Sequence, residues 1–225
     1  MTSEPVRIAI VGLDHWYTAI PLAQAITLHP ETQLVGIYDA DAARARQVAT
    51  KVGCKRVAAS PTELIEDDGV QVVAAFASVD RNPDTCVAAA EAGKHIVSVK
   101  PLARTLDEAT TILTAVRKAG VRFLPGESRS RSTAHHRQLR TWAREGRFGR
   151  PLTATFQMWG GLPKGWPGAT SSGWFTDADR APGGGWIDHA IYHIDLLRWV
   201  FDTNVVKVSG KTANLKHAEL PFEDY

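Results

Sequence analysis

Short apolar runs alternate with segments of helical spacing along the first 125 positions. An apolar run between turn residues predicts a buried strand, and apolar residues three or four apart predict an amphipathic helix. Buried strands that alternate with helices imply a parallel sheet covered on both faces. The pattern predicts strands over 6–11, 34–38, 70–76, 95–99 and 121–124, and helices over 17–28, 41–52, 83–92 and 106–119.

The pattern changes near Pro125-Gly126, where the regular alternation stops. A helix over 134–144, an alternating strand over 153–159 and a Gly-, Pro- and Trp-rich loop over 160–185 are expected next. A helix over 186–201 and a strand over 205–215 follow. The fold class is therefore α/β, with a doubly wound Rossmann domain over 1–124. A second, partial α+β domain is expected over 125–225.

Composition is that of an ordinary soluble globular protein. The chain has 225 residues, 44% hydrophobic and 22% charged, with a net charge of +2. These values exclude intrinsic disorder, and such an even charge balance does not call for a polyanionic partner. Two cysteines exclude a disulfide framework, which favours a cytoplasmic protein. The polar N-terminus and the lack of a long apolar run predict neither a signal peptide nor a membrane partner.

A basic stretch lies between Arg129 and Arg150, with seven arginines and a single acid, Glu145. Nucleic-acid binding would need a continuous basic face with base-stacking groups. The helical spacing of these arginines instead indicates a solvated face, or side chains that reach a cofactor phosphate. No nucleic-acid partner is predicted.

The turn after the first strand is the candidate phosphate-binding corner. Gly12 fits the tight turn that a dinucleotide fold needs, and Leu13, Asp14 and His15 follow it. Asp14 stands where a second glycine is expected and Tyr17 where a third is expected, so the glycine fingerprint is degraded. An ordinary strand-to-helix turn is the competing interpretation.

Asp39 ends the second strand, at the place where an acidic side chain accepts hydrogen bonds from ribose hydroxyls. Because a carboxylate repels a 2′-phosphate, Asp39 favours NAD over NADP. The alternative is a solvated residue at the start of a helix.

Three further segments carry a family resemblance: 88–103, which contains Lys100-Pro101, 183–188, which begins with three glycines, and 195–199. In this order after a nucleotide fold they resemble the glucose–fructose oxidoreductase and inositol dehydrogenase (Gfo/Idh/MocA) family. The resemblance implies an NAD(P)-dependent oxidoreductase acting on sugars, cyclitols or related polyols. It also implies a second domain on an open, mainly antiparallel sheet, through which a homo-oligomer is expected. The chain is shorter than typical members.

The resemblance also implies site residues. Lys100 would lie beside the nicotinamide and the substrate hydroxyl, with a cis peptide before Pro101, and Ser78 falls in the turn after the third strand that contacts the cofactor. The family's Asp-x-Gly-x-His-x-x-Asp motif maps onto residues 188–195. Val99 replaces the glutamate before the lysine, and Ala190 replaces the motif glycine. Tyr192 occupies the position of the catalytic histidine, and His193 comes one residue late.

Alcohol oxidation requires a group that takes the hydroxyl proton while the cofactor takes the hydride. Lys100, Asp188, Tyr192 and His193 are the candidates; Asp188 and Tyr192 share a helix face because they are four apart. The competing interpretations are that Lys100 is a surface lysine, that Asp188 is a charge favoured at a helix N-terminus, and that Tyr192 is packed in the core. His189 and His193 have metal-ligand spacing, but no third ligand is apparent, so no metal is predicted.

The tryptophans of the long loop and its flanks offer flat apolar surfaces on which sugar C–H faces stack. The candidate substrate-binding residues are Trp159, Trp166, Trp174 and Trp186. Packing between the two domains would explain them equally well. The sequence therefore favours an NAD-dependent sugar or polyol oxidoreductase. A non-catalytic binding protein of the same fold, or a fragment that self-associates through an exposed sheet face, remain the alternatives.

Overall fold

Five strands form one parallel sheet in the order β2-β1-β3-β4-β5 in the computed structural model, which describes residues 4–126 and 131–224. Chain order reverses at β1, which pairs with β2 on one side and β3 on the other. This is the doubly wound Rossmann arrangement that the sequence predicted. The elements are β1 (Val6–Val11), α1 (Trp16–Leu28), β2 (Thr32–Tyr38), α2 (Ala42–Val52), α3 (Pro61–Ile65), β3 (Val72–Ala75), α4 (Asn82–Glu91), β4 (His95–Val97), α5 (Leu106–Ala119) and β5 (Phe123–Leu124).

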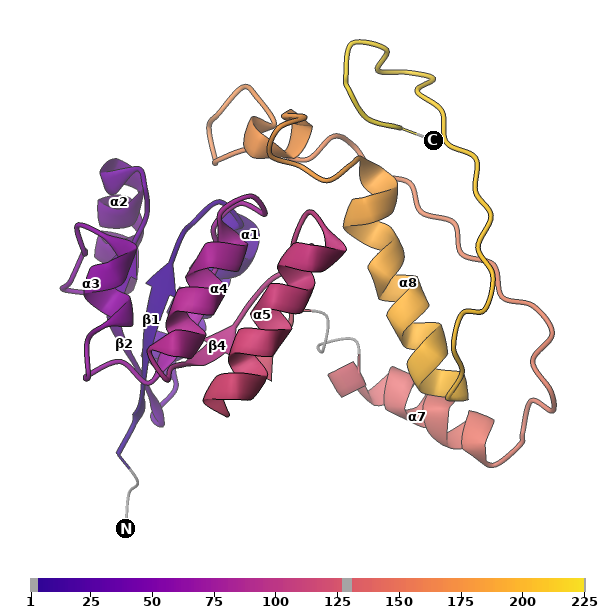
Figure 1. Ribbon diagram of the computed structural model, residues 1–225, viewed down its shortest axis with the longest axis horizontal. Coiled ribbons are helices and arrows are strands. Elements are labelled where there is room, and N and C mark those ends of the chain that lie inside the picture. The colour runs from indigo at the N-terminus through magenta and orange to yellow at the C-terminus, as the bar shows by residue number, and fades with distance from the viewer. Residues whose placement is uncertain (1–3, 127–130, 225) are drawn as a thin grey trace.

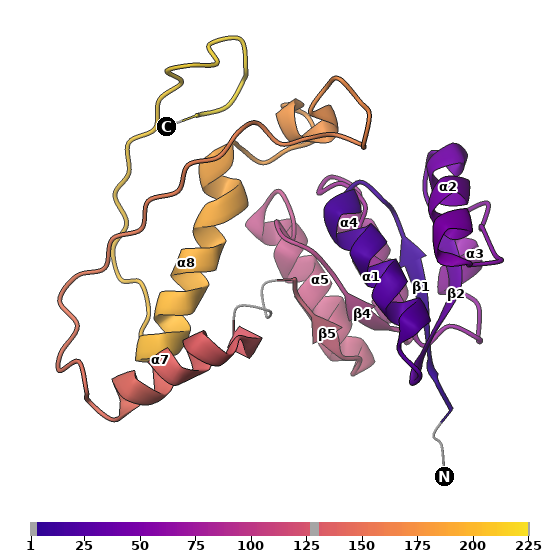
Figure 2. The ribbon, with the colours of Figure 1, turned by 180° about the vertical axis from the view of Figure 1, so that it is seen from behind.

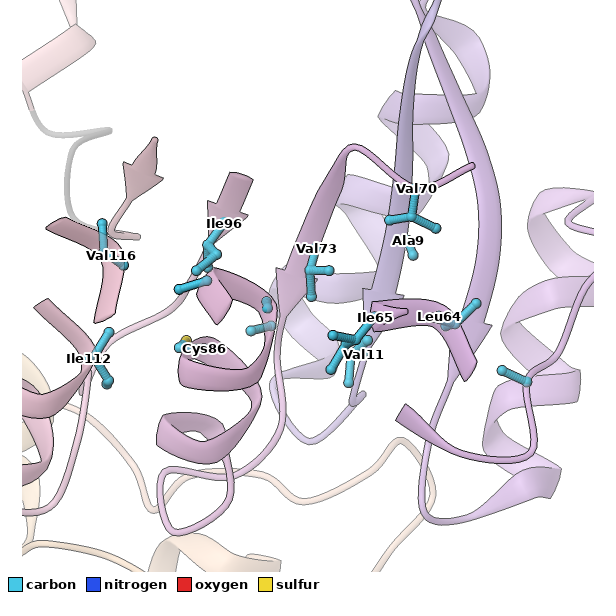
Figure 3. Packing of buried hydrophobic residues seen from close by; sticks show 14 residues of the cluster. Ala9, Val11, Leu64, Ile65, Val70, Val73, Cys86, Ile96, Ile112 and Val116 are labelled. Atoms are coloured by element: carbon cyan, nitrogen blue, oxygen red, sulfur yellow. The ribbon is translucent and has the colours of Figure 1, made fainter. Parts of the chain in front are cut away.

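Helices cover both faces of the sheet (Figures 1 and 2). α1 and α2 pack on one face around the fully buried Ile10, Ile37 and Phe76. α3, α4 and α5 pack on the other, where Val73 and Ile96 of the strands and Ile112 of α5 belong to one buried apolar cluster (Figure 3). The near-continuous apolar strands are required because water reaches neither face.

Local signals place most helix ends where the sequence predicted them. The Asp41 carboxylate caps α2 by accepting from the amide of Ala43 at 2.9 Å, and Gly53 ends the helix at φ 72°. α5 begins with a capping box between Thr105 and Glu108. Strand ends differ by a few residues from the predicted ranges. The short helix α3 was not predicted, because five residues are too few to show a period.

The second half contains α7 (Ala134–Arg144), the 3₁₀ helix η1 (Gly173–Thr176) and α8 (Gly185–Phe201). The two helices were predicted. The strands expected over 153–159 and 205–215 do not form, and the described part of this half contains no sheet. Both segments run extended beside α8, on its side away from the parallel sheet (Figures 1 and 2).

An alternating pattern of apolar and polar residues predicts a segment that can form a β-strand. The strand forms only when a neighbouring strand completes its hydrogen bonds. Neither extended segment has such a neighbour among the described residues. Their apolar side chains are correspondingly open to solvent: Trp159 is 87% exposed and Val206 97%.

Three arginines of the basic stretch have partners within the chain. Arg131 binds the Asp195 carboxylate with two nitrogens, and the Arg140 guanidinium lies 4.5 Å from the centre of the Trp199 ring. Arg147 donates to Glu145 at 2.6 Å. Arg129 lies outside the described residues. The contacts of Arg131 and Arg140 hold α7 and the residues before it against α8.

Two further findings bear on the sequence-based expectations. Of the helices in the described ranges, none is long and apolar enough to cross a membrane. Cys54 and Cys86 are both free, and burial raises the pKa of the Cys86 thiol to about 12. Cys86 therefore behaves as a packed apolar side chain.

Replacing Ile112 by Ala tests the core beneath α5. Ile112 is fully buried, so its truncation leaves a cavity and lowers the free energy of unfolding by about 2–5 kcal/mol. The neighbouring Leu113, 37% exposed on the same helix, is the matched control, and Leu113→Ala changes stability by less than about 1 kcal/mol. Urea unfolding measures both values. Equal losses in the two variants would contradict this packing.

Candidate active site

Gly12 permits the close contact that shapes the corner at the end of β1. Its φ is +89°, and a Cβ placed there would lie 2.4 Å from the backbone nitrogen of Ala77. The turn after β1 therefore packs directly on the turn after β3, which only a glycine allows. This is the geometry that a dinucleotide fold needs at its pyrophosphate corner.

Two carboxylates lie at this corner. Asp39, buried at the end of β2, accepts from the amides of Leu13 at 2.7 Å and Asp41 at 2.9 Å. Burial raises the pKa of Asp39, and these two N–H donors partly offset the rise. Asp14 accepts from the amide of Ser78 at 2.8 Å. Asp39 and Asp14 thus bring two carboxylates to the same edge of the sheet.

His15 is fully buried just before α1. Its Nδ1 donates a hydrogen bond to the Ala77 carbonyl at 2.9 Å, because a carbonyl oxygen can only accept. The centre of its ring lies 5.0 Å from the centre of the Trp174 ring. Burial lowers the pKa of His15 from 6.5 to about 4, with the nearby Lys100 ammonium adding to the decrease. In the part of the chain that the structure describes, Nε2 has no hydrogen-bond partner. His15 is therefore a neutral packing residue at neutral pH.

Lys100, Asp188 and Tyr192 come together where the loop after β4 meets α8. The Lys100 ammonium donates to both the carbonyl and the Oδ1 of Asp188 at 2.5 Å. The same ammonium lies 4.9 Å from the centre of the Tyr192 ring. The peptide between Lys100 and Pro101 is cis, as the resemblance implied. The lysine and aspartate side chains are only 11% and 19% exposed, so the ion pair is largely shielded from water.

The chain's last described residues stabilise the helix that carries Asp188. The Glu223 carboxylate accepts from the amide of Gly184 at 3.1 Å and from that of Trp186 at 3.3 Å. These amides begin α8, where a carboxylate is favoured by the unpaired N–H groups and the helix dipole. A Cβ at Gly184 would lie 2.2 Å from the Glu223 carbonyl oxygen, so this contact needs the glycine.

The other predicted site residues do not form one group. His193 stacks on Phe156 at 4.3 Å between ring centres, on α8 but apart from the lysine contacts. Trp166 and Trp174 line one cavity above the glycine corner, whereas Trp159 and Trp186 are 87% and 61% exposed outside it. The four tryptophans therefore do not make a single sugar-binding surface in this conformation.

Ser78 is fully buried and belongs to the corner through its backbone and its hydroxyl. The hydroxyl accepts from Nη2 of Arg180 at 2.7 Å. His189 lies 3.5 Å from the Asp188 carboxylate. Within the ranges described, no three His, Cys, Asp or Glu side chains gather as a metal site would require.

Glu223 and Arg180 were not predicted as site residues. Both act across long sequence separations, on Gly184 and Ser78 respectively. No local sequence motif predicts such contacts. The only sequence signal for Glu223 was the run of three glycines at 183–185, which marks a helix start open to close approach.

Comparison with known proteins finds two matches to family models. Residues 6–127 match the model of an oxidoreductase family with an NAD-binding Rossmann fold, GFO_IDH_MocA, and residues 136–225 match the GFO/IDH/MocA C-terminal domain. Together the matched residues cover most of the chain.

Relatives and solved structures agree with these two family matches. The chain is 32% identical to a 1,5-anhydro-D-fructose reductase of Ensifer adhaerens over 76% of this chain and 49% of the relative. It is 28% identical to a scyllo-inositol 2-dehydrogenase (NAD(+)) of Bacillus subtilis over 91% of this chain and 56% of the relative. A levoglucosan dehydrogenase in complex with NADH and levoglucosan has the same fold, with a TM-score of 0.69, 22% identity, and coverage of 88% of this chain and 54% of that one. The chain thus spans about half the length of these relatives.

The buried His15 predicts a loss of stability in acid. Its pKa is about 4 in the folded chain and 6.5 in the unfolded chain, so the unfolded state binds the proton first as the pH falls. The stability due to neutral His15 is complete above pH 6.5 and is lost between 6.5 and 4, by about 3 kcal/mol. Urea unfolding of wild type and His15→Gln from pH 7 to 4 isolates this contribution. Parallel pH dependence in the two proteins would contradict it.

Proposed function

Because this chain belongs to the Gfo/Idh/MocA oxidoreductase family, we propose that it transfers a hydride between a nicotinamide cofactor, NAD in preference to NADP, and a sugar, cyclitol or related polyol. The observation that carries the proposal is the shielded group of Lys100, Asp188 and Tyr192. It lies at the carboxyl end of the parallel sheet, where open α/β sheets bind their ligands.

The corner at the end of β1 fits a dinucleotide. Gly12 allows the close turn, Leu13, Asp14 and His15 continue it, and Asp39 is positioned to accept the ribose hydroxyls. The preference for NAD rests on Asp39, whose negative charge repels a 2′-phosphate. Ser78 and the Lys100-Pro101 turn complete the proposed cofactor-binding residues.

Lys100 is the proposed proton-transferring group. When bound, NAD would supply the hydride acceptor for the substrate carbon, and NADH the hydride donor. In the reducing direction the Lys100 ammonium gives a proton to the substrate oxygen, and in the oxidising direction the neutral amine takes it back. Asp188 holds the nitrogen in place through two contacts and balances its charge.

Tyr192 is the proposed hydrogen-bonding partner of the substrate hydroxyl. It stands where the family has a histidine and lies beside the Lys100 ammonium. A phenol hydroxyl can donate or accept a hydrogen bond, and the proton transfer is assigned to Lys100 because Asp188 holds that nitrogen in place. His193 remains a predicted acid or base, and its stacking on Phe156 supports a packing role instead.

The substrate is proposed as a polyol because the named relatives act on inositol and anhydrofructose, and because Trp166 and Trp174 line the cavity beside the corner. Trp159 and Trp186 stay as predicted substrate contacts. Residues 1–124 would bind the cofactor and residues 125–225 the substrate. The open sheet of the second part, the homo-oligomer formed through it and the cytoplasmic location remain predictions.

A second candidate is a non-catalytic binding protein of the same family. Tyr192 in place of histidine and Asp14 at the pyrophosphate corner favour it. Titration with NADH and NADPH, read by energy transfer from tryptophan to the reduced nicotinamide, tests cofactor binding in either case. We expect NADH to bind at least about tenfold more tightly than NADPH, a difference of about 1.4 kcal/mol. Binding of neither would overturn the enzyme and leave a sugar-binding protein of the same fold, or a self-associating fragment, as the alternatives.

Lys100→Arg separates the enzyme from the binding protein. Arginine keeps a positive charge beside Asp188 but does not release its proton, so kcat should fall by about 10²–10⁴-fold while NADH affinity is retained. Rates are measured with NAD⁺ and scyllo-inositol or myo-inositol, and with NADH and 1,5-anhydro-D-fructose. The exposed Lys118→Arg is the control and keeps wild-type rates. Full activity in Lys100→Arg would refute the role of Lys100.

A further inference from the structure

Two arginines from different halves of the chain line the same small cavity as Asp14. The cavity has a volume of about 100 Å³ and lies above the glycine corner. Arg44 reaches it from α2, and Arg180 reaches it from the segment after η1. Its lining includes Leu13, Asp14, Arg44, Trp166, Trp174 and Arg180.

Arg180 is held over the turn after β3 by side chains of that turn. Its Nη2 donates to the Ser78 hydroxyl at 2.7 Å and its Nε to the Asp80 carboxylate at 3.3 Å. Burial alone would raise the pKa of Asp80, but hydrogen bonds from Ser78 and Arg180 hold it below its usual value. The preceding Asp179 is anchored as well, because its carbonyl accepts from Arg104 at 3.1 Å. The guanidinium is therefore positioned at the corner by the parallel-sheet half.

Arg44 is held on the opposite side. Its guanidinium lies 3.8 Å from Asp14, 3.4 Å from Asp41 and 5.1 Å from the centre of the Trp166 ring. Trp166 follows Lys164, whose carbonyl accepts from the Trp16 indole at 3.3 Å. Segment 164–181 thus lies across the glycine corner and carries Arg180, one of the two arginines that line the cavity.

The local charges show why these cations matter. A dinucleotide fold commonly offers backbone amides to the pyrophosphate from a glycine-rich turn. Here Asp14 stands in that turn, and a carboxylate beside a diphosphate repels it. Two guanidinium groups line the same cavity, where Arg180 is paired with Asp80 and Arg44 with Asp14 and Asp41. Planar guanidinium groups also match phosphate oxygens in a two-pronged hydrogen bond.

We propose that Arg180, assisted by Arg44, binds the diphosphate of the cofactor and takes over the part of this task that the altered turn does not perform. The proposal rests on the proposed binding of NAD(H). The cavity is smaller than the roughly 300–1,000 Å³ of ligand sites, so segment 164–181 moves outward to admit the cofactor. Arg180 then exchanges the Asp80 carboxylate for phosphate oxygens.

Three ligands and three variants test the assignment by equilibrium binding. NADH and ADP carry the diphosphate, whereas adenosine carries none. Arg180→Gln should weaken NADH and ADP binding by about 10–100-fold and leave adenosine unchanged, because only a charged hydrogen bond to phosphate is lost. Arg180→Lys should recover part of the loss. Asp14→Asn, which keeps the acceptor for the Ser78 amide, should tighten NADH and ADP binding.

Calorimetric titration of all three ligands at fixed ionic strength gives the dissociation constants, and the exposed Arg147→Gln is the matched control. ADP binding within twofold of wild type in Arg180→Gln would overturn the proposal while leaving NAD binding intact. An equal loss for adenosine would also overturn it, since the residue would then act only on the shape of the site. A wild-type chain that binds neither NADH nor ADP would overturn the proposed function as well.

Discussion

The ion pair between Lys100 and Asp188 is the contact on which the candidate site depends. It joins the loop after β4 to the first turn of α8, and both side chains are mostly shielded from water. A shielded charge pair is stable only when its geometry is good and its remaining hydrogen-bonding groups are satisfied. The second contact to the Asp188 carbonyl meets that condition, and Glu223 holds the helix start from the other side. These contacts join the two halves of the chain at the proposed site of proton transfer.

The carboxyl edge of the sheet gathers the remaining parts of the site. Gly12 brings the turn after β1 against that after β3, and this contact positions Asp14 beside Ser78. The same edge receives segment 164–181 through Trp16 and Arg180. The glycine corner, segment 164–181 and Lys100 therefore lie at the carboxyl edge of the sheet, where open α/β sheets bind their ligands.

Local signals in the sequence were sufficient for the first half of the fold, apart from the short helix α3. Apolar runs, the cap at Asp41 and the glycine after α5 each depend on neighbouring residues, and the structure confirms them. The second half was predicted less well, because strands over 153–159 and 205–215 need partners that no local pattern supplies. At the site, the spacing of Asp188 and Tyr192 on one helix face was readable from the sequence. The roles of Arg180 and Glu223 were not, since their partners lie far away in the chain.

Transfer of a labelled hydride tests the central claim most directly. The chain is incubated with NAD⁺ and scyllo-inositol or myo-inositol carrying deuterium on every ring carbon, and the reduced nicotinamide is analysed by mass spectrometry. The account predicts one deuterium in each NADH formed, because the hydride passes directly from carbon to cofactor without exchange with water. NADH without the label would contradict direct transfer. Failure to form NADH from any polyol, although the chain binds NAD⁺, would show a binding protein instead of an enzyme.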